Sequence, residues 1–259
     1  MIRRFMPVFA IVRRELQSVM ATPAGWAVIG GTVGAVLVTA ALSAPGGYQA
    51  TAVDLYIMLE LLIPMVGVAI GYRGLLHDRL SGEWSIHRAL GVRPSTYVIG
   101  TLTGQATVLG LLIGAGTAGA TMLVWLGRTR PLSFLASNPA VADPAPMLWL
   151  IGFSVAYGVV IAAVVGLLSV YARGRRSAVL GSVVVVGALI AGLDAVTIAT
   201  STPLSVMVLI SPGAAYRALV LTVGVGLSTG GPVLLALVGW TGWVLIAVSL
   251  SVRRLRAMV

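Results

Sequence analysis

The charged residues of this chain are scarce, and one group of them, which includes both histidines, lies between two apolar stretches, in residues 77–100. In this segment, HDRLSGEWSIHRALGVRPSTYVIG, acidic and basic side chains alternate, and Trp84 and Ile86 lie between charges. The spacing predicts a short amphipathic helix that stops at residues 91–94, a form suited to docking in a groove of a partner protein. A solvated helix that only connects two neighbouring helices fits the same pattern.

The two histidines of the segment could bind a metal ion or transfer protons. His77 and His87 are ten residues apart, with Asp78 and Glu83 nearby, but we favour ordinary solvated loop residues over a metal site. No other histidine occurs in the sequence. A membrane-embedded Ser-His protease would therefore lack its base and a zinc protease its ligands, so we predict no catalytic residue and no metal site.

All 17 basic residues are arginine, and lysine is absent. A GxxxxGK(S/T) phosphate-binding loop therefore cannot exist, and the chain does not hydrolyse ATP by that route. The sequence predicts a protein that is not an enzyme and that binds no cofactor of its own.

Two acidic residues fall inside apolar stretches, Glu60 and Asp194. An ionised group in lipid is costly unless it faces a cavity, a polar partner or another subunit, so both are candidates for a substrate or ion pathway. For Glu60 we favour a structural hydrogen bond within a helical bundle, and water near the membrane surface would account for Asp194. Asp54 and Arg217 are most simply residues of the membrane interface.

The elements that carry these residues are long and apolar. Of the 259 residues, 58% are hydrophobic and 9% charged, and the mean hydropathy is +1.03, which leaves too little polar surface to cover a water-soluble globule. A membrane-spanning helix needs about 20 apolar residues. Six windows meet this length, at residues 24–44, 54–76, 97–126, 147–170, 177–199 and 232–252. The sequence predicts an all-α polytopic membrane protein with six transmembrane helices.

The arginines predict the orientation of these helices. Fourteen of them fall in four segments that alternate along the chain: before the first window, between the second and third, between the fourth and fifth, and after the sixth. Only Arg128, Arg130 and Arg217 fall on the other side. The positive-inside rule therefore puts both termini in the cytoplasm, and we expect a multi-pass protein of a prokaryotic cell membrane. The net charge of +10 comes from arginines at helix ends, where we expect them to contact anionic lipid head groups. We therefore expect no nucleic acid partner.

Residues 1–23 predict a separate helix that lies in the cytoplasmic membrane interface. Apolar residues recur there at spacings of three and four, while Arg13, Arg14 and Glu15 mark the opposite side. The helix should end before Pro23, because proline can begin the next helix but cannot continue the previous one.

Residues 200–231 predict a hairpin on the outer side of the membrane. Two apolar stretches, residues 204–210 and 214–227, are separated by Ser211-Pro212-Gly213. Each is too short to span the bilayer, so we expect a re-entrant or interfacial helical hairpin.

Glycines at positions 100, 104, 110 and 114 line the third window. Such a row lets a neighbouring helix approach closely. We favour close helix contacts within one chain over a seam between two copies.

Three segments together carry a resemblance to a known family. Residues 77–100 resemble the cytoplasmic loop of ABC-2 type transporter permeases, in which an acidic-Arg pair, a glycine and an apolar residue lead into a Ser-Pro-like turn and a glycine at the head of the third span. The N-terminal Arg13-Arg14-Glu15-Leu16 is similar to the family's basic-Glu-Leu helix before span one, and Ser211-Pro212 with Tyr216-Arg217 to its element before span six. In the loop, the matching residues are Asp78, Arg79, Gly82, Trp84, residues 91–95, Tyr97 and Gly100.

The resemblance implies the membrane-spanning permease subunit of an ATP-binding-cassette transporter, most simply an exporter. ATP and Mg would then be bound by a pair of separate ATPase subunits, and the permease would act as a homodimer or with a sister permease. Residues 24–259 would form the transmembrane domain, with a coupling loop at 77–96. The ATPase would grip that loop together with residues 1–23. The residues implied in this coupling are Asp78, Arg79, Gly82, Glu83, Trp84 and Arg88, with Arg13, Arg14 and Glu15 from the N-terminal helix.

A proton- or sodium-coupled secondary transporter that uses Glu60 and Asp194 is the alternative. The two halves of the chain show no sequence symmetry and no matched pair of broken spans, which argues against it. An apolar pathway of small residues suits lipids, hydrophobic peptides and drugs equally well, so the sequence selects no substrate.

Overall fold

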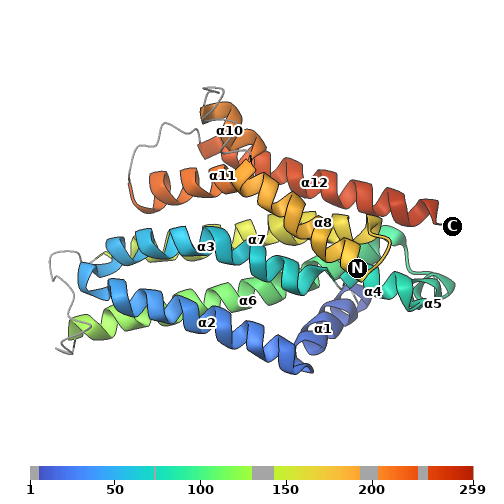
Figure 1. Cartoon of the computed structure of the whole chain (residues 1–259), viewed down its shortest axis with the longest axis horizontal. Helices are drawn as coiled ribbons and strands as arrows, with labels where there is room; N and C mark the ends of the chain where they lie inside the picture. Colours follow the sequence, from blue (N-terminus) through green and yellow to red (C-terminus); the bar gives the residue numbers. More distant parts are fainter. Residues whose placement is uncertain (1–5, 73, 130–142, 193–203, 227–232, 259) are drawn as a thin grey trace.

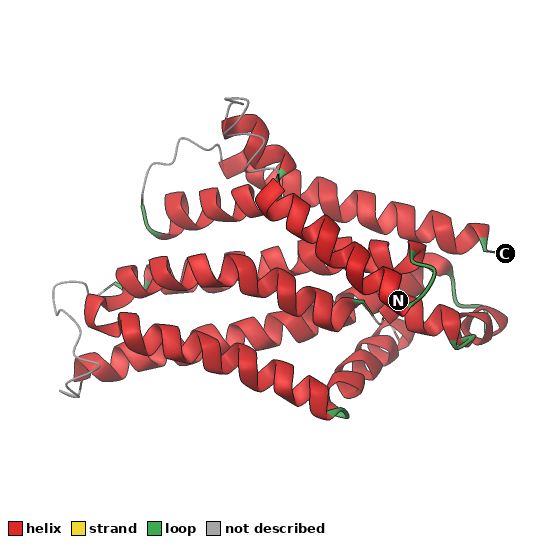
Figure 2. Ribbon diagram, in the orientation of Figure 1, coloured by secondary structure: helices red, strands yellow, loops and turns green. Residues whose placement is uncertain are grey.

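The structure of the protein is a computed structural model that describes residues 6–72, 74–129, 143–192, 204–226 and 233–258. These residues are helical apart from short turns, and no strand occurs among them (Figures 1 and 2). The helices are α1 (Met6–Met20), α2 (Pro23–Ser43), α3 (Gly47–Gly71), α4 (Gly74–Leu80), α5 (Glu83–Ala89), α6 (Pro94–Thr129), α7 (Ala145–Tyr171), α8 (Arg175–Gly187), α10 (Leu204–Ile210), α11 (Pro212–Leu219) and α12 (Val233–Ala257). The predicted all-α class is confirmed.

Four stretches of the described chain are long and apolar enough to cross a membrane: Pro23–Leu80, Pro94–Leu126, Ala145–Tyr171 and Val233–Ala257. The first holds α2 and α3, which fold back on each other around the short 3-10 turn η2 (Ala44–Gly46) (Figure 1). Large apolar side chains on these helices face outward; Met65, for example, is 70% exposed. The described chain is therefore compatible with a multi-pass membrane protein.

The junction between α1 and α2 lies where the proline predicts it. Pro23 is the first residue of α2, and the Thr22 hydroxyl accepts a hydrogen bond from the Gly25 amide at 3.1 Å. This contact satisfies one of the four backbone donors that a helix leaves open at its start. The chain turns sharply here, so α1 and α2 form an elbow at one end of the bundle (Figure 1).

Helix α1 packs on α6 through the glycines of that helix. A Cβ atom at Gly104 would lie 2.7 Å from Cγ of Glu15, so only glycine allows α1 this close. Ile11 packs in the same way against Gly100. The predicted contact within one chain is confirmed at these two glycines. The prediction that Glu15 marks the solvated side of α1 is wrong, since Glu15 is buried against α6.

The segment between α3 and α6 forms two short helices in place of the one predicted. Helix α4 follows α3, and α5 begins after Gly82, whose φ of 79° lies in the left-handed region that glycine adopts without strain. Gly91 ends the segment with a φ of 76°, close to the predicted stop. The turn at Gly82 folds α5 back beside α4 at the end of the bundle (Figure 1).

Helix α8 continues as the π-helical turn η3 (Ala188–Gly192), and α11 as η4 (Val220–Gly224). The predicted break near residues 211–213 is present, because α10 ends at Ile210 and α11 begins at Pro212. Ser211 caps α11 by accepting a hydrogen bond from the Ala214 amide at 3.2 Å. Asp194, a predicted pathway residue, lies outside the described residues.

The segments that carry the clustered arginines gather at one end of the bundle. Figure 1 shows α1, α4, α5 and the C-terminal end of α12 together there, while the turn between α2 and α3 lies at the opposite end. We call the first of these the arginine-rich end. The candidate site lies within it.

Candidate functional site

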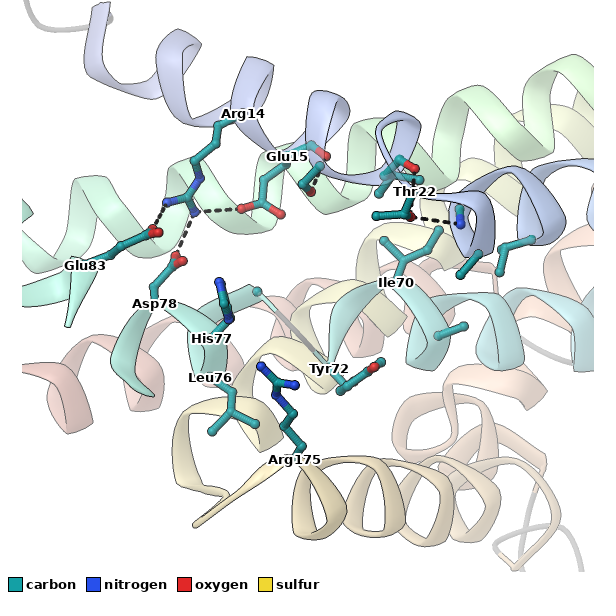
Figure 3. Close-up of a pocket in the computed structure, with 17 residues that line it drawn as sticks. Arg14, Glu15, Thr22, Ile70, Tyr72, Leu76, His77, Asp78, Glu83 and Arg175 are labelled. Atoms are coloured by element: carbon teal, nitrogen blue, oxygen red, sulfur yellow. Dashed lines mark hydrogen bonds and ion pairs between the residues drawn. The ribbon is translucent and has the colours of Figure 1, made fainter. Parts of the chain in front are cut away.

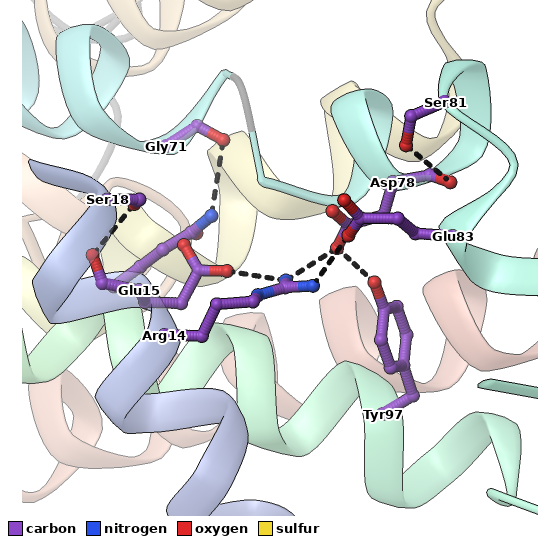
Figure 4. A network of polar contacts seen from close by, with 9 residues as sticks. Arg14, Glu15, Ser18, Gly71, Asp78, Ser81, Glu83 and Tyr97 are labelled. Carbon is purple, nitrogen blue, oxygen red and sulfur yellow. Dashed lines mark hydrogen bonds and ion pairs between the residues drawn. The ribbon is translucent and has the colours of Figure 1, made fainter. Parts of the chain in front are cut away.

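Arg14 of α1 is the centre of a charge cluster at the arginine-rich end (Figure 4). Its guanidinium donates hydrogen bonds to Asp78 at 2.7 Å, to Glu15 at 2.8 Å and to Glu83 at 2.9 Å. Asp78 belongs to α4 and Glu83 to α5. One side chain of α1 thus holds both short helices of the predicted coupling loop. We call Arg14, Glu15, Asp78 and Glu83 the Arg14 cluster.

The aspartate of the cluster is buried beneath its neighbours. Asp78 is 3% exposed, and its carboxylate accepts a second hydrogen bond, from the hydroxyl of Tyr97 at the start of α6. The Tyr97 ring in turn packs on Trp84 and on His87, with ring centroids 5.0 and 5.1 Å apart. α1, α4, α5 and α6 therefore meet in one connected contact.

Burial and charge act in opposite directions on the groups of the cluster. Burial by itself would lower the pKa of Arg14, but the hydrogen bond to Glu15 and the charge of Asp78 raise that pKa above its ordinary value. Burial raises the pKa of Glu15 above 4.5, although Arg14 opposes the shift. Arg14 therefore stays charged, and Glu15 holds its proton more tightly than a solvated glutamate does.

Arg79 connects the same segment to a different helix. Its guanidinium donates one hydrogen bond to the carbonyl of Val170 at 2.8 Å and another to the carbonyl of Ala172. These carbonyls lie at the C-terminal end of α7, where helical acceptors have no partner within the helix. Arg79 thus caps α7 and ties α4 to it.

The other predicted coupling residues differ in exposure. Trp84 is buried, and Gly82 is half-buried in the turn before α5. Arg13 and Arg88 are exposed. Three large apolar residues of the loop are exposed as well: Leu80, Ile86 and Leu90 are 53%, 61% and 75% exposed.

A cleft of about 690 Å³ opens beside the Arg14 cluster (Figure 3). Its walls come from the elbow of α1 and α2 on one side, from the end of α3 and from α4 at the back, and from Arg175 of α8 on the other side. The cleft thus lies where the N-terminal helix meets the apolar helices.

Glu60 lies in a second polar site, deeper in the bundle. Its carboxylate pairs with Nε of Arg217 from α11 at 3.2 Å. The neighbouring Tyr216 stacks on Tyr157 of α7, with ring centroids 4.8 Å apart, and shares a hydrogen bond of 2.7 Å with Ser154. Arg217 is therefore the polar partner that Glu60 needs within an apolar stretch, and an ion-coupled transporter would have to break this pair. Asp54, the other acidic residue of α3, accepts a hydrogen bond from Ser43 at 2.6 Å.

Sequence reasoning identified most members of these sites but missed their partners. Arg14 and Asp78 are 64 residues apart, and Glu60 and Arg217 are separated further, so no local spacing joins them. One signal was present for the first pair. Arg14, Asp78 and Tyr97 each belong to a segment already singled out as a motif, and motif residues often share a site.

No protein-family model matches the sequence, and no curated protein matches it.

Proposed function

We propose that this chain is the permease subunit of an ATP-binding-cassette exporter, driven by a pair of separate ATPase subunits that bind ATP and Mg. It would cross a prokaryotic cell membrane six times through α2, α3, α6, α7, α8 with η3, and α12. Both termini would be cytoplasmic, and the hairpin of α10 and α11 would lie toward the outer side. The working unit would contain two permeases, either two copies of this chain or one with a sister subunit.

The Arg14 cluster is the observation that carries the proposal. Two segments that resemble the permease family, the N-terminal helix and the loop between α3 and α6, are joined by the contacts of Arg14 with Asp78 and Glu83. Tyr97 extends the same contact to α6. A loop that only connected two spans would not need to bury the carboxylate of Asp78 against Arg14 and Tyr97, because exposed loop charges are satisfied by water.

The exposed face of α5 is the expected docking surface for the ATPase. Ile86 and Leu90 are exposed apolar residues four positions apart, with the exposed Arg88 between them in sequence, and a short amphipathic helix of this kind binds in a groove of a partner protein. Exposed apolar residues at the end of a bundle, beyond the apolar spans, are typical of protein contacts.

The buried contacts would pass a push on α5 to the membrane helices. Trp84 and Tyr97 lead from α5 to α6, Asp78 and Arg14 lead to α1, and Arg79 leads to α7. Closure of the ATPase subunits on ATP would then move these helices as a rigid body and switch the pathway between inward- and outward-facing forms.

Co-purification with an ATPase tests the docking surface. The purified protein should carry a P-loop ATPase, and Ile86→Glu should release it, because the charge would be buried in an apolar groove. Ser85→Ala, an exposed change on the same helix, should leave the complex intact. An ATPase retained equally by both variants would contradict docking on this face, and failure of any ATPase to bind would contradict the function.

Cysteine labelling tests the orientation independently. The chain has no cysteine, so single cysteines can be introduced at the exposed positions Ser85 and Gln49. A membrane-impermeant maleimide should label Gln49→Cys in intact cells and Ser85→Cys only after permeabilisation. Labelling of Ser85→Cys from outside would place the coupling loop on the wrong side.

A further inference from the structure

The cleft beside the Arg14 cluster combines apolar and charged walls. Val19, Val28 and Ile70 provide apolar surface from α1, α2 and α3, while Arg175 and the Arg14 cluster provide charge. Its volume of about 690 Å³ is typical of a site for a small molecule or for part of a larger one. An amphipathic ligand fits walls of these two kinds.

The positive charge of the cleft lies on the α8 side. Arg175 is exposed, lies in the first turn of α8, and its side chain forms no hydrogen bond or ion pair with any residue that the structure describes. Its guanidinium extends toward the cleft near His77 (Figure 3). The start of a helix adds partial positive charge at the same place. This side therefore suits a phosphate group.

The opposite side of the cleft has an excess of negative charge. Glu15, Asp78 and Glu83 all line it, and the single Arg14 guanidinium serves all three carboxylates. Three carboxylates against one guanidinium leave this side of the cleft with more negative than positive groups. A second cation with hydrogen-bond donors would compensate part of this excess.

We propose that the cleft binds one phospholipid whose head group carries both a phosphate and a primary ammonium, as in phosphatidylethanolamine. The phosphate lies at Arg175, the ammonium lies at Glu15 beside the Arg14 cluster, and the acyl chains run along Val28 and Ile70. The lipid enters from the leaflet at the arginine-rich end. This site requires only that the bundle is embedded in a bilayer, and it holds whether or not an ATPase binds α5.

Other phospholipids satisfy one side of the cleft only. Phosphatidylglycerol supplies a phosphate but no cation, and it would add negative charge beside three carboxylates. Phosphatidylcholine carries a quaternary ammonium that cannot donate a hydrogen bond to a carboxylate. Selectivity for the primary ammonium is therefore the signature of the site.

Native mass spectrometry of the purified full chain tests this selectivity. The protein is equilibrated in micelles that contain equal amounts of phosphatidylethanolamine, phosphatidylglycerol and phosphatidylcholine, and the retained lipid is identified. The wild-type protein should retain one phosphatidylethanolamine in preference to the others. Arg175→Gln should weaken this retention by about tenfold, as expected for loss of one charge-assisted hydrogen bond. Arg176→Gln is the matched control, since Arg176 is also exposed but does not line the cleft, and it should retain the lipid as the wild type does.

A second variant and a soluble competitor complete the test. Glu15→Gln should remove the preference for phosphatidylethanolamine over phosphatidylglycerol, and Arg175→Gln keeps the test valid if Glu15→Gln fails to fold. Glycerophosphoethanolamine, the head group without acyl chains, should displace the lipid only at large excess. Equal retention of all three lipids by the wild type, unchanged retention by Arg175→Gln, or displacement by an equal amount of the soluble head group would each overturn the proposal.

Discussion

The two ion-paired sites of the described chain join distant helices in different ways. In the Arg14 cluster, one guanidinium serves three carboxylates and the group borders an open cleft. In the pair of Glu60 and Arg217, one carboxylate meets one guanidinium in the middle of the apolar helices. The first site has an excess of negative charge, and the second is balanced.

Depth in the bundle accounts for this difference. The side chains of Arg14 and Glu83 are 33% and 41% exposed, so water can compensate an uneven count of charges at the arginine-rich end. The side chain of Glu60 is only 12% exposed between apolar helices, so its carboxylate needs a cation at contact distance. The comparison indicates a fixed, structural role for Glu60 and Arg217, and a role in external contacts for the Arg14 cluster.

Loss of Asp78 should have the largest effect on stability. Asp78→Ala removes the buried acceptor for Arg14 and Tyr97 and leaves both donors without it, which should lower the free energy of unfolding by about 3 kcal/mol or more. Denaturation of the purified protein in mixed micelles measures this change. Arg13→Ala, an exposed change one residue from Arg14, is the control. Equal stability of the two variants would show that the Arg14 cluster does not hold the loop.

Because Glu60 and Arg217 balance each other, we expect that replacing both residues restores stability that is lost when only one is replaced. Glu60→Leu alone should cost about 2–3 kcal/mol of unfolding free energy, because Arg217 keeps its charge without the carboxylate. Combined Glu60→Leu and Arg217→Leu should recover most of that loss. The same denaturation assay measures Glu60→Leu, Arg217→Leu and the double variant as a double-mutant cycle. If the double variant is less stable than either single variant, the charges of Glu60 and Arg217 do not simply compensate each other.

Arg79 should contribute less than the ion pairs do. Arg79→Gln shortens the side chain and removes the hydrogen bonds to the carbonyls of Val170 and Ala172, at a cost of about 1–2 kcal/mol. Arg88→Gln, an exposed arginine of the same loop, should change stability by less than about 0.5 kcal/mol. If both variants lost the same stability, Arg79 would not be the residue that holds α4 against α7.

The smallest expected effect is a pH dependence that arises from Glu15. Because its pKa is raised in the folded protein, Glu15 contributes stability that is fully present below the ordinary value of 4.5 and is lost as the pH rises through the raised value. The wild-type protein should therefore gain stability relative to Glu15→Gln as the pH falls from neutral toward 4.5. Unfolding midpoints of the two proteins across this range measure the difference, and parallel curves would contradict it.

The positions of the helices could be predicted from the sequence because their signals are local. Pro23 marks the start of α2. The length of the apolar stretch predicted both ends of α7 to within two residues. The glycines of α6 predicted a close neighbour, but they could not say that the neighbour is α1. The partners of Arg14 and Glu60 depend on how helices cross, and a single sequence contains no signal for that. Glu15 was assigned to the wrong side because a charged residue normally faces water, whereas here the buried carboxyl accepts a hydrogen bond from Arg14.

Two spin labels provide the most direct measurement of the central claim, that Arg14 holds α1 and α5 together as one unit. Because the chain has no cysteine, labels can be attached at the exposed positions of a Gln17→Cys, Ser85→Cys double variant, and electron paramagnetic resonance reports the distribution of distances between them. We predict one narrow distribution that broadens when Arg14→Gln is added and stays narrow when Arg13→Gln is added. A distribution that is broad from the start, or one that Arg14→Gln leaves unchanged, would contradict the account.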